Sequence, residues 1–144
     1  MAVNVTYEKT SPTLDTFTIG AQALPELKID YSALSQEDRN QEHTGARFLC
    51  AAALACFTNT FTNALVRKGA EVKSMTASAE ISKEKDDLMR TRYTEIILQV
   101  EVGLDEANRE IFEQVKENML AGSLVTYTLE DTIEFDYDLT MKAV

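Results

Sequence analysis

The sequence predicts an α+β fold in the order βββ-α-ββ-α-β, and three observations carry this prediction. An apolar stretch long enough for a core helix occupies residues 46–69, near the middle of the chain. Short extended segments precede it, and longer segments of alternating apolar and polar residues follow it. A second helical pattern interrupts these later segments once. Because strands come in runs and do not alternate with helices throughout, the order is typical of an α+β fold and not of a doubly wound parallel sheet.

Three short strands are expected at the start of the chain. They cover residues 3–8, 15–21 and 27–31, and each is rich in Thr, Val, Ile, Tyr or Phe. Turn-forming residues such as Pro12 and Pro25 separate them. The polar stretch 35–45 that follows is expected to be a loop, in which Ser35 begins one helical turn.

Residues 46–69 are expected to form the core helix. Residues that can pack in a core recur there at spacings of three and four: Phe48, Leu49, Ala52, Ala53, Cys56, Phe57, Thr60, Phe61, Ala64 and Leu65. Alanines between them leave almost no polar face before Thr58, so the helix is expected to be buried on several sides. Thr44 is the expected N-cap, and two basic residues precede Gly69 at the end, as helix C-termini favour.

Three further strands and a second helix are expected after the core helix. The strands cover residues 72–81, 93–102 and 132–141, and apolar side chains alternate with polar ones in each. The charged stretch between the first two strands is expected to connect a hairpin. The second helix is expected to run from its cap, Asp105, to about Leu120, with an apolar stripe that includes Ile111, Val115 and Met119. The prediction is therefore a central buried helix packed on antiparallel sheets.

Composition and charge favour a single domain over residues 1–144 and exclude several kinds of partner. The chain has 44% hydrophobic and 26% charged residues, which are ordinary values for a globular protein. Its formal net charge of -10 argues against binding to nucleic acid or to an anionic membrane surface. The longest apolar run, residues 48–57, is too short to cross a bilayer, and the N-terminus lacks the pattern of a secretion signal. A cytoplasmic location is therefore expected.

Both cysteines, Cys50 and Cys56, are expected on the core helix. Six helical residues rise about 9 Å, whereas bridged Cα atoms lie at most about 7 Å apart, so no disulfide between them is expected. Cys50 is expected to be a core residue. With His43 as the one histidine and no CxxC pair, a zinc site is not expected. The glycines form no nucleotide-binding loop, so the sequence predicts no metal and no cofactor.

Two stretches of the chain form a specific ordered pattern: FLCAAALACFTNTF leading to ALVRKGAEV, and VEVGLDEANREIFEQVKENMLAGSLVTYTLE. The first resembles the alanine-rich core helix of the OsmC/Ohr family of thiol-dependent hydroperoxide reductases, which carries the reactive cysteine and ends in a basic turn. The second is similar to that family's later strand, acidic helix start and short segment ending in Thr-Leu. The resemblance spans roughly residues 44–140, and the N-terminal strands agree only in kind.

The resemblance implies an intertwined homodimer with one site per subunit at the interface. It gives Cys56 the role of the residue that attacks an organic hydroperoxide, after which a second cysteine of the family forms a disulfide with it. Ser123 stands at the position of that second cysteine. Ala46 stands where the family has a glutamate, and residues 1–38 contain no arginine, although the family's activating arginine comes from this region. Regeneration is therefore expected to use an external thiol reductant.

The residues themselves leave two interpretations of Cys56 open. Burial in apolar surroundings raises the pKa of a thiol, and a site three turns into a helix gains little from the helix dipole. Reactivity would then need a cation, and the candidates are Arg39, Arg47, Arg90 and Arg92. The first hypothesis is a divergent OsmC-like redox protein that reduces organic hydroperoxides through Cys56. The alternative is a peroxidase-inactive homodimer that binds a small apolar ligand or a protein partner in the interface pocket.

The other polar and aromatic candidates have simple structural interpretations. His43 is expected to face solvent in its polar loop. Ser123 is expected either in a turn at the end of the second helix or as a hydrogen-bonding group in the pocket. Phe57 and Phe61 flank Cys56 at helical spacing, and they are expected in the core or along a channel for an apolar substrate.

Overall fold

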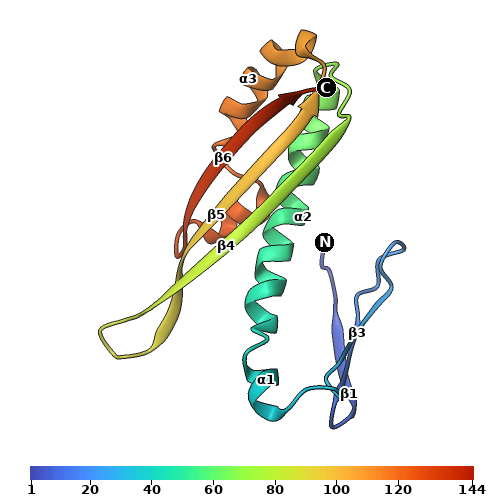
Figure 1. Ribbon diagram of the computed structural model, residues 1–144, viewed down its shortest axis with the longest axis vertical. Coiled ribbons are helices and arrows are strands. Elements are labelled where there is room, and N and C mark those ends of the chain that lie inside the picture. The colour runs from blue at the N-terminus through green and yellow to red at the C-terminus, as the bar shows by residue number, and fades with distance from the viewer. The chain divides into compact units, whose positions relative to one another are not determined.

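The computed structural model describes all 144 residues, which form two compact units, Met1–His43 and Thr44–Val144 (Figure 1). Each unit contains one three-stranded sheet. The two longest helices lie in the second unit. The predicted α+β class is therefore confirmed. That the whole chain forms a single domain stays a prediction.

The first unit is an antiparallel meander followed by a short helix. Its strands are β1 (Thr6–Ser11), β2 (Leu14–Thr18) and β3 (Glu26–Asp30). Asp15 on β2 accepts hydrogen bonds from the side chains of Tyr7, at 2.9 Å, and Lys9, at 2.8 Å, on β1. Helix α1 (Gln36–Asn40) follows Ser35, whose side chain accepts a first-turn amide at 3.1 Å. The three strands and the helical turn are confirmed, with strand boundaries shifted by a few residues.

Helix α2 (Thr44–Arg67) is the longest element, and it begins at the residue expected to cap it. One face of α2 is buried, through Ala46, Ala53, Phe57, Phe61 and Leu65. Residues on its other faces, among them Ala51, Ala52 and Ala55, are exposed. The expectation of burial on several sides is therefore not met within this chain, because the elements of the second unit cover one face of the helix.

The length and composition of the helical stretch Gln36–Arg67 would also allow it to span a membrane. The core helix of a water-soluble domain passes the same test, so this finding is weak evidence for a membrane. The expectation that no segment crosses a bilayer stays a prediction.

The sheet of the second unit combines a hairpin with a parallel strand. Its strands are β4 (Ser74–Lys85), β5 (Thr91–Leu104) and β6 (Glu134–Ala143). β4 and β5 form the expected antiparallel hairpin, with Met75 opposite Val102. β6 lies parallel to β5, with Phe135 beside Ile96, so the expectation of antiparallel sheets is wrong for the last strand. The helices between β5 and β6 return the chain to the end of the sheet where β5 begins, and β6 therefore runs in the same direction.

The helices between β5 and β6 differ in part from expectation. The stretch expected as one helix contains η1 (Glu106–Asn108) and α3 (Arg109–Met119). Asp105 caps this stretch as expected, since its carboxylate accepts the Ala107 amide at 2.9 Å. A further helix, α4 (Leu124–Leu129), was not expected. Its sequence LVTYTL is rich in β-branched residues that favour strands, and packing of the segment against α2 overrides this preference.

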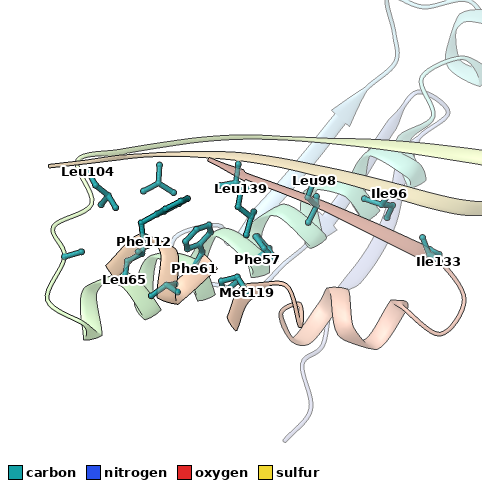
Figure 2. Close-up of a cluster of buried hydrophobic side chains, with 14 residues drawn as sticks. Phe57, Phe61, Leu65, Ile96, Leu98, Leu104, Phe112, Met119, Ile133 and Leu139 are labelled. Carbon is teal, nitrogen blue, oxygen red and sulfur yellow. The ribbon is translucent and has the colours of Figure 1, made fainter. Parts of the chain in front are cut away.

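The core of the second unit lies between the sheet and its helices (Figure 2). Phe57 and Phe61 project into it from α2, and Phe112 and Met119 project from α3. The strands contribute alternate residues of one sheet face: Ile96, Leu98, Val100, Val102 and Leu139. The rings of Phe61 and Phe112 stack with centroids 6.2 Å apart. Because these rings fix the rotation of α2 over the sheet, they also fix the direction in which Cys56 points.

Candidate functional site

Cys56 lies on the flank of α2, and its side chain is partly buried. Four hydrogen-bond donors meet at its sulfur: the backbone amides of Leu124 and Val125 and the hydroxyls of Ser123 and Thr60. Three of these donors belong to α4 and its N-cap, while Thr60 lies one turn further along α2. The first amides of a helix have no acceptor within the helix, so the start of α4 can supply them to the thiol.

Burial of Cys56 pushes the pKa of its thiol upward, but the four donors outweigh this effect. A hydrogen bond to sulfur stabilises the charged form more than the neutral thiol. The pKa of Cys56 is therefore lower than that of an ordinary cysteine. Burial acts in the expected direction, but the expectation that a cation is needed to offset it is wrong, because neutral donors from α4 and α2 take that role.

Cys50 has a different environment on the same helix. Burial raises the pKa of its thiol, and the positive charge of Arg47 offsets this only in part. Cys50 and Cys56 are both free thiols, and Cys50 is partly buried where a core position was expected. The surroundings of Cys50 therefore raise the pKa of its thiol, whereas those of Cys56 lower it.

Ser123 is the N-cap of α4, and the structure brings it into contact with Cys56. Ser123 is 4% exposed, and Thr126 beside it is fully buried. The Ser123 amide donates to the Thr126 hydroxyl at 2.8 Å, and the two hydroxyl oxygens lie 3.3 Å apart. Ser123 is therefore a buried hydrogen-bonding group beside Cys56 as well as the residue that caps α4.

Two residues that the sequence did not single out, Tyr137 and Glu130, continue these hydrogen bonds. The Tyr137 hydroxyl donates to Glu130 Oε1 at 2.7 Å, and its ring stacks on Phe57 with centroids 5.1 Å apart. Gly122, at a φ of +85°, lies against the same groups, since a Cβ there would sit 2.8 Å from the Thr126 hydroxyl and 2.9 Å from that of Tyr137. The one feature of the sequence that could have revealed this pair is a tyrosine on the apolar face of a predicted strand, because the hydroxyl of a buried tyrosine needs a hydrogen-bond partner.

The four arginines expected as candidate cations lie in different places. Arg90 lies in the turn between β4 and β5 and pairs with Asp86 at 3.3 Å. Arg92 is exposed near the start of β5, and Arg39 belongs to the first unit. Arg47 lies near the start of α2 and acts on the other cysteine. The groups that lower the pKa of the candidate thiol are neutral, so the site differs from one activated by an arginine.

The remaining predicted positions make no contribution to this site. His43 is exposed just before α2, as expected, and Ala46 places a buried methyl where the resembling family has a glutamate. No group of three or more His, Cys, Asp or Glu side chains is arranged to bind a metal ion. That the protein uses no metal and no cofactor stays a prediction.

Comparisons with known proteins agree with the resemblance. A family model described as OsmC-like protein matches residues 38–138. Among solved structures, an OsmC-like protein from Mycoplasma pneumoniae has a TM-score of 0.71 at 14% identity, over 98% of this chain and 97% of that chain. An organic hydroperoxide resistance protein from Elizabethkingia anophelis has a TM-score of 0.59 at 10% identity, over 100% of this chain and 97% of that chain. The organic hydroperoxide resistance protein OhrB of Bacillus subtilis has a TM-score of 0.57 at 13% identity, over 99% of this chain and 98% of that chain. A comparison with curated proteins found no match.

Proposed function

The chain belongs to the OsmC-like protein family, and on that premise we propose that Cys56 reduces organic hydroperoxides to alcohols in oxidative stress defence. The observation that carries the proposal is the set of four donors at the Cys56 sulfur, which lowers the pKa of this thiol. The thiolate is the nucleophilic form of cysteine, so these donors favour reaction. Two structurally similar proteins are named organic hydroperoxide resistance proteins, which supports this class of substrate.

The proposed reaction transfers two electrons from sulfur to the peroxide. The Cys56 thiolate attacks the terminal oxygen of the hydroperoxide, so that a sulfur–oxygen bond forms while the oxygen–oxygen bond breaks. Cys56 becomes a sulfenic acid, and the departing alkoxide takes up the proton that the thiol released, which gives the alcohol. The hydroxyls of Ser123 and Thr60, which donate to the sulfur, would hydrogen-bond the oxygen that it gains.

Regeneration in this proposal uses an external thiol. Cys50 lies six residues earlier on α2, a rise of about 9 Å, and the Ser123 hydroxyl cannot form a disulfide. One small thiol converts the sulfenic acid into a mixed disulfide and releases water. A second small thiol then releases the Cys56 thiol and leaves as a disulfide with the first. A reducing compartment such as the cytoplasm supplies thiols of this kind, so a cytoplasmic location belongs to the proposal.

A homodimer is also part of the proposal. Much of the apolar surface of α2 is exposed in the single chain, including Ala51, Ala52 and Ala55. Apolar surface of this kind favours association, and a second copy of the same helix offers a matching surface. Each subunit would then carry one Cys56 site. Light scattering of the purified protein measures this association directly.

Treatment with cumene hydroperoxide tests the proposed reaction. One equivalent is added to the reduced protein in the presence of dimedone, which traps sulfenic acids, and the intact mass is recorded. We expect a dimedone adduct that peptide mapping assigns to Cys56, together with one equivalent of cumyl alcohol. Cys50→Ser is the matched control and keeps the adduct, whereas Cys56→Ser loses it.

A wild-type protein that yields neither adduct nor alcohol contradicts the proposed reaction. The alternative, a peroxidase-inactive homodimer that binds a small apolar ligand or a protein partner, would then be preferred. That alternative predicts that Cys56→Ser binds an apolar fluorescent probe as tightly as the wild type does, since binding needs a pocket but no ionised thiol.

A further inference from the structure

The hydrogen bonds at Cys56 continue into the protein as a chain of three hydroxyl groups that ends at a carboxylate. The Ser123 hydroxyl bonds the Cys56 sulfur, and its oxygen lies 3.3 Å from that of the Thr126 hydroxyl. Thr126 in turn bonds the hydroxyl of Tyr137, which donates to Glu130 Oε1 at 2.7 Å. A hydroxyl group both donates and accepts. The three hydroxyl hydrogens can therefore be donated along the series either in the direction of Glu130 or in the direction of Cys56.

The middle of this hydroxyl chain is shielded from water, whereas its outer end is not. Ser123 is 4% exposed and Thr126 is fully buried, so both hydroxyls depend on partners within the protein for their hydrogen bonds. The ring of Tyr137 is held by stacking on Phe57. Glu130, at the outer end of the hydroxyl chain, is partly exposed. Linked hydroxyls in such a shielded place polarise one another, so a change of charge at one end affects the other.

We propose that Glu130 is a positioning residue that controls the ionisation of Cys56 through this hydroxyl chain. While Glu130 is a carboxylate, it accepts from Tyr137, and the hydroxyls behind Tyr137 are drawn toward it. Ser123 then shares its proton between Thr126 and the sulfur. When the charge on Glu130 is removed, the hydroxyls are free to reverse, and Ser123 donates fully to the thiolate. The use of this thiolate against peroxide rests on the proposed function, but its ionisation does not.

Other titratable groups on the elements around the hydroxyl chain must be separated from this effect. They include Arg47 and Cys50 on α2, Lys116 and Glu117 in the last turns of α3, Tyr127 on α4 and Asp131 in the turn that follows. On the face of the sheet that packs against the helices, the part of β5 from Ile96 to Leu104 and the residues paired with it on β4 and β6 include one titratable side chain, that of Tyr137. Asp131 adjoins Glu130 and is exposed, so Asp131→Asn is a matched control for the loss of one negative charge.

The pH dependence of Cys56 alkylation by iodoacetamide measures the coupling without any peroxide. All variants are made in a Cys50→Ser background, so that one thiol reacts. We expect Glu130→Gln to lower the midpoint by about half a pH unit, which is about threefold faster alkylation below the midpoint. In a Tyr137→Phe background, which keeps the stacked ring, the same Glu130→Gln change should have little effect. Asp131→Asn should shift the midpoint less than Glu130→Gln does.

Equal effects of Glu130→Gln with and without the Tyr137 hydroxyl would overturn the proposal, because the carboxylate would then act through space. No effect of Glu130→Gln in either background would overturn it as well. If Tyr137→Phe does not fold, Thr126→Val breaks the same chain at its buried middle and is tested in its place. If Cys56 of the wild type does not react with peroxide but the variants show the expected shifts of the alkylation midpoint, the proposed function is contradicted and this coupling is supported.

Discussion

Cys50 and Cys56 lie six residues apart on one helix, yet their surroundings push the pKa of the two thiols in opposite directions. At Cys50 burial is the larger effect, and a nearby arginine opposes it only in part. At Cys56 the start of α4 supplies hydrogen-bond donors that outweigh burial. The comparison teaches that the element packed against a helix decides the ionisation of a cysteine on it, more than the cysteine's position along the helix.

Ser123→Cys should change the chemistry at Cys56 most. The Ser123 side chain already contacts the Cys56 sulfur, so the introduced thiol lies within reach for a disulfide. One equivalent of cumene hydroperoxide should then give an internal disulfide and no lasting sulfenic acid, as thiol counting and intact mass would show. Thr128→Cys, on the exposed side of α4, is the control and should give no such disulfide. An internal disulfide leaves Cys50 as the one free thiol of this variant. If the oxidised variant instead keeps two free thiols, that of Cys50 and the introduced one, α4 does not adjoin Cys56.

The wild-type protein should distinguish its two thiols at neutral pH. Iodoacetamide reacts with the thiolate, and the pKa is lowered at Cys56 but raised at Cys50. We expect Cys56 to be alkylated several-fold faster at pH 7, since a thiol with a lower pKa holds a larger fraction of thiolate at that pH. Mass spectrometry of peptides from a time course gives both rates in one sample. Equal rates, or faster reaction of Cys50, would remove the contrast between the two sites.

Ser123→Ala should make Cys56 more like Cys50. The lost hydroxyl donates to the sulfur and favours its charged form, so its removal raises the pKa of Cys56. The alkylation curve should move to higher pH, and alkylation at pH 7 should slow by about threefold. The rate at Cys50 should stay unchanged, which provides an internal control. A curve that does not move would assign the low pKa of Cys56 to the backbone amides of α4 alone.

The sequence is sufficient to predict what depends on local pattern, but not what depends on contacts between distant segments. The alternation of apolar and polar residues predicted the strands of the β4–β5 hairpin, and the long apolar stretch predicted α2. The direction of β6 depends on where two helices return the chain, which no local pattern contains. The donors to Cys56 come mainly from residues 123–125, far from it in sequence, and the β-branched residues of the α4 segment LVTYTL conceal the helix that presents them. Cys56 could therefore be singled out from sequence, whereas the cause of its low pKa could not.

Arg47→Ala should give the smallest effect, confined to the Cys50 side of the comparison. The positive charge of Arg47 lowers the pKa of Cys50, so its removal should raise that pKa and slow alkylation of Cys50 by about twofold at pH 7. The effect should be modest because Arg47 is exposed and its charge is screened by solvent and salt. Alkylation in a Cys56→Ser background isolates the Cys50 rate, and high salt should reproduce part of the change in the protein that retains Arg47. If Arg47→Ala slowed Cys56 as much as Cys50, the two thiols would share one electrostatic environment, and neutral donors could not explain their difference.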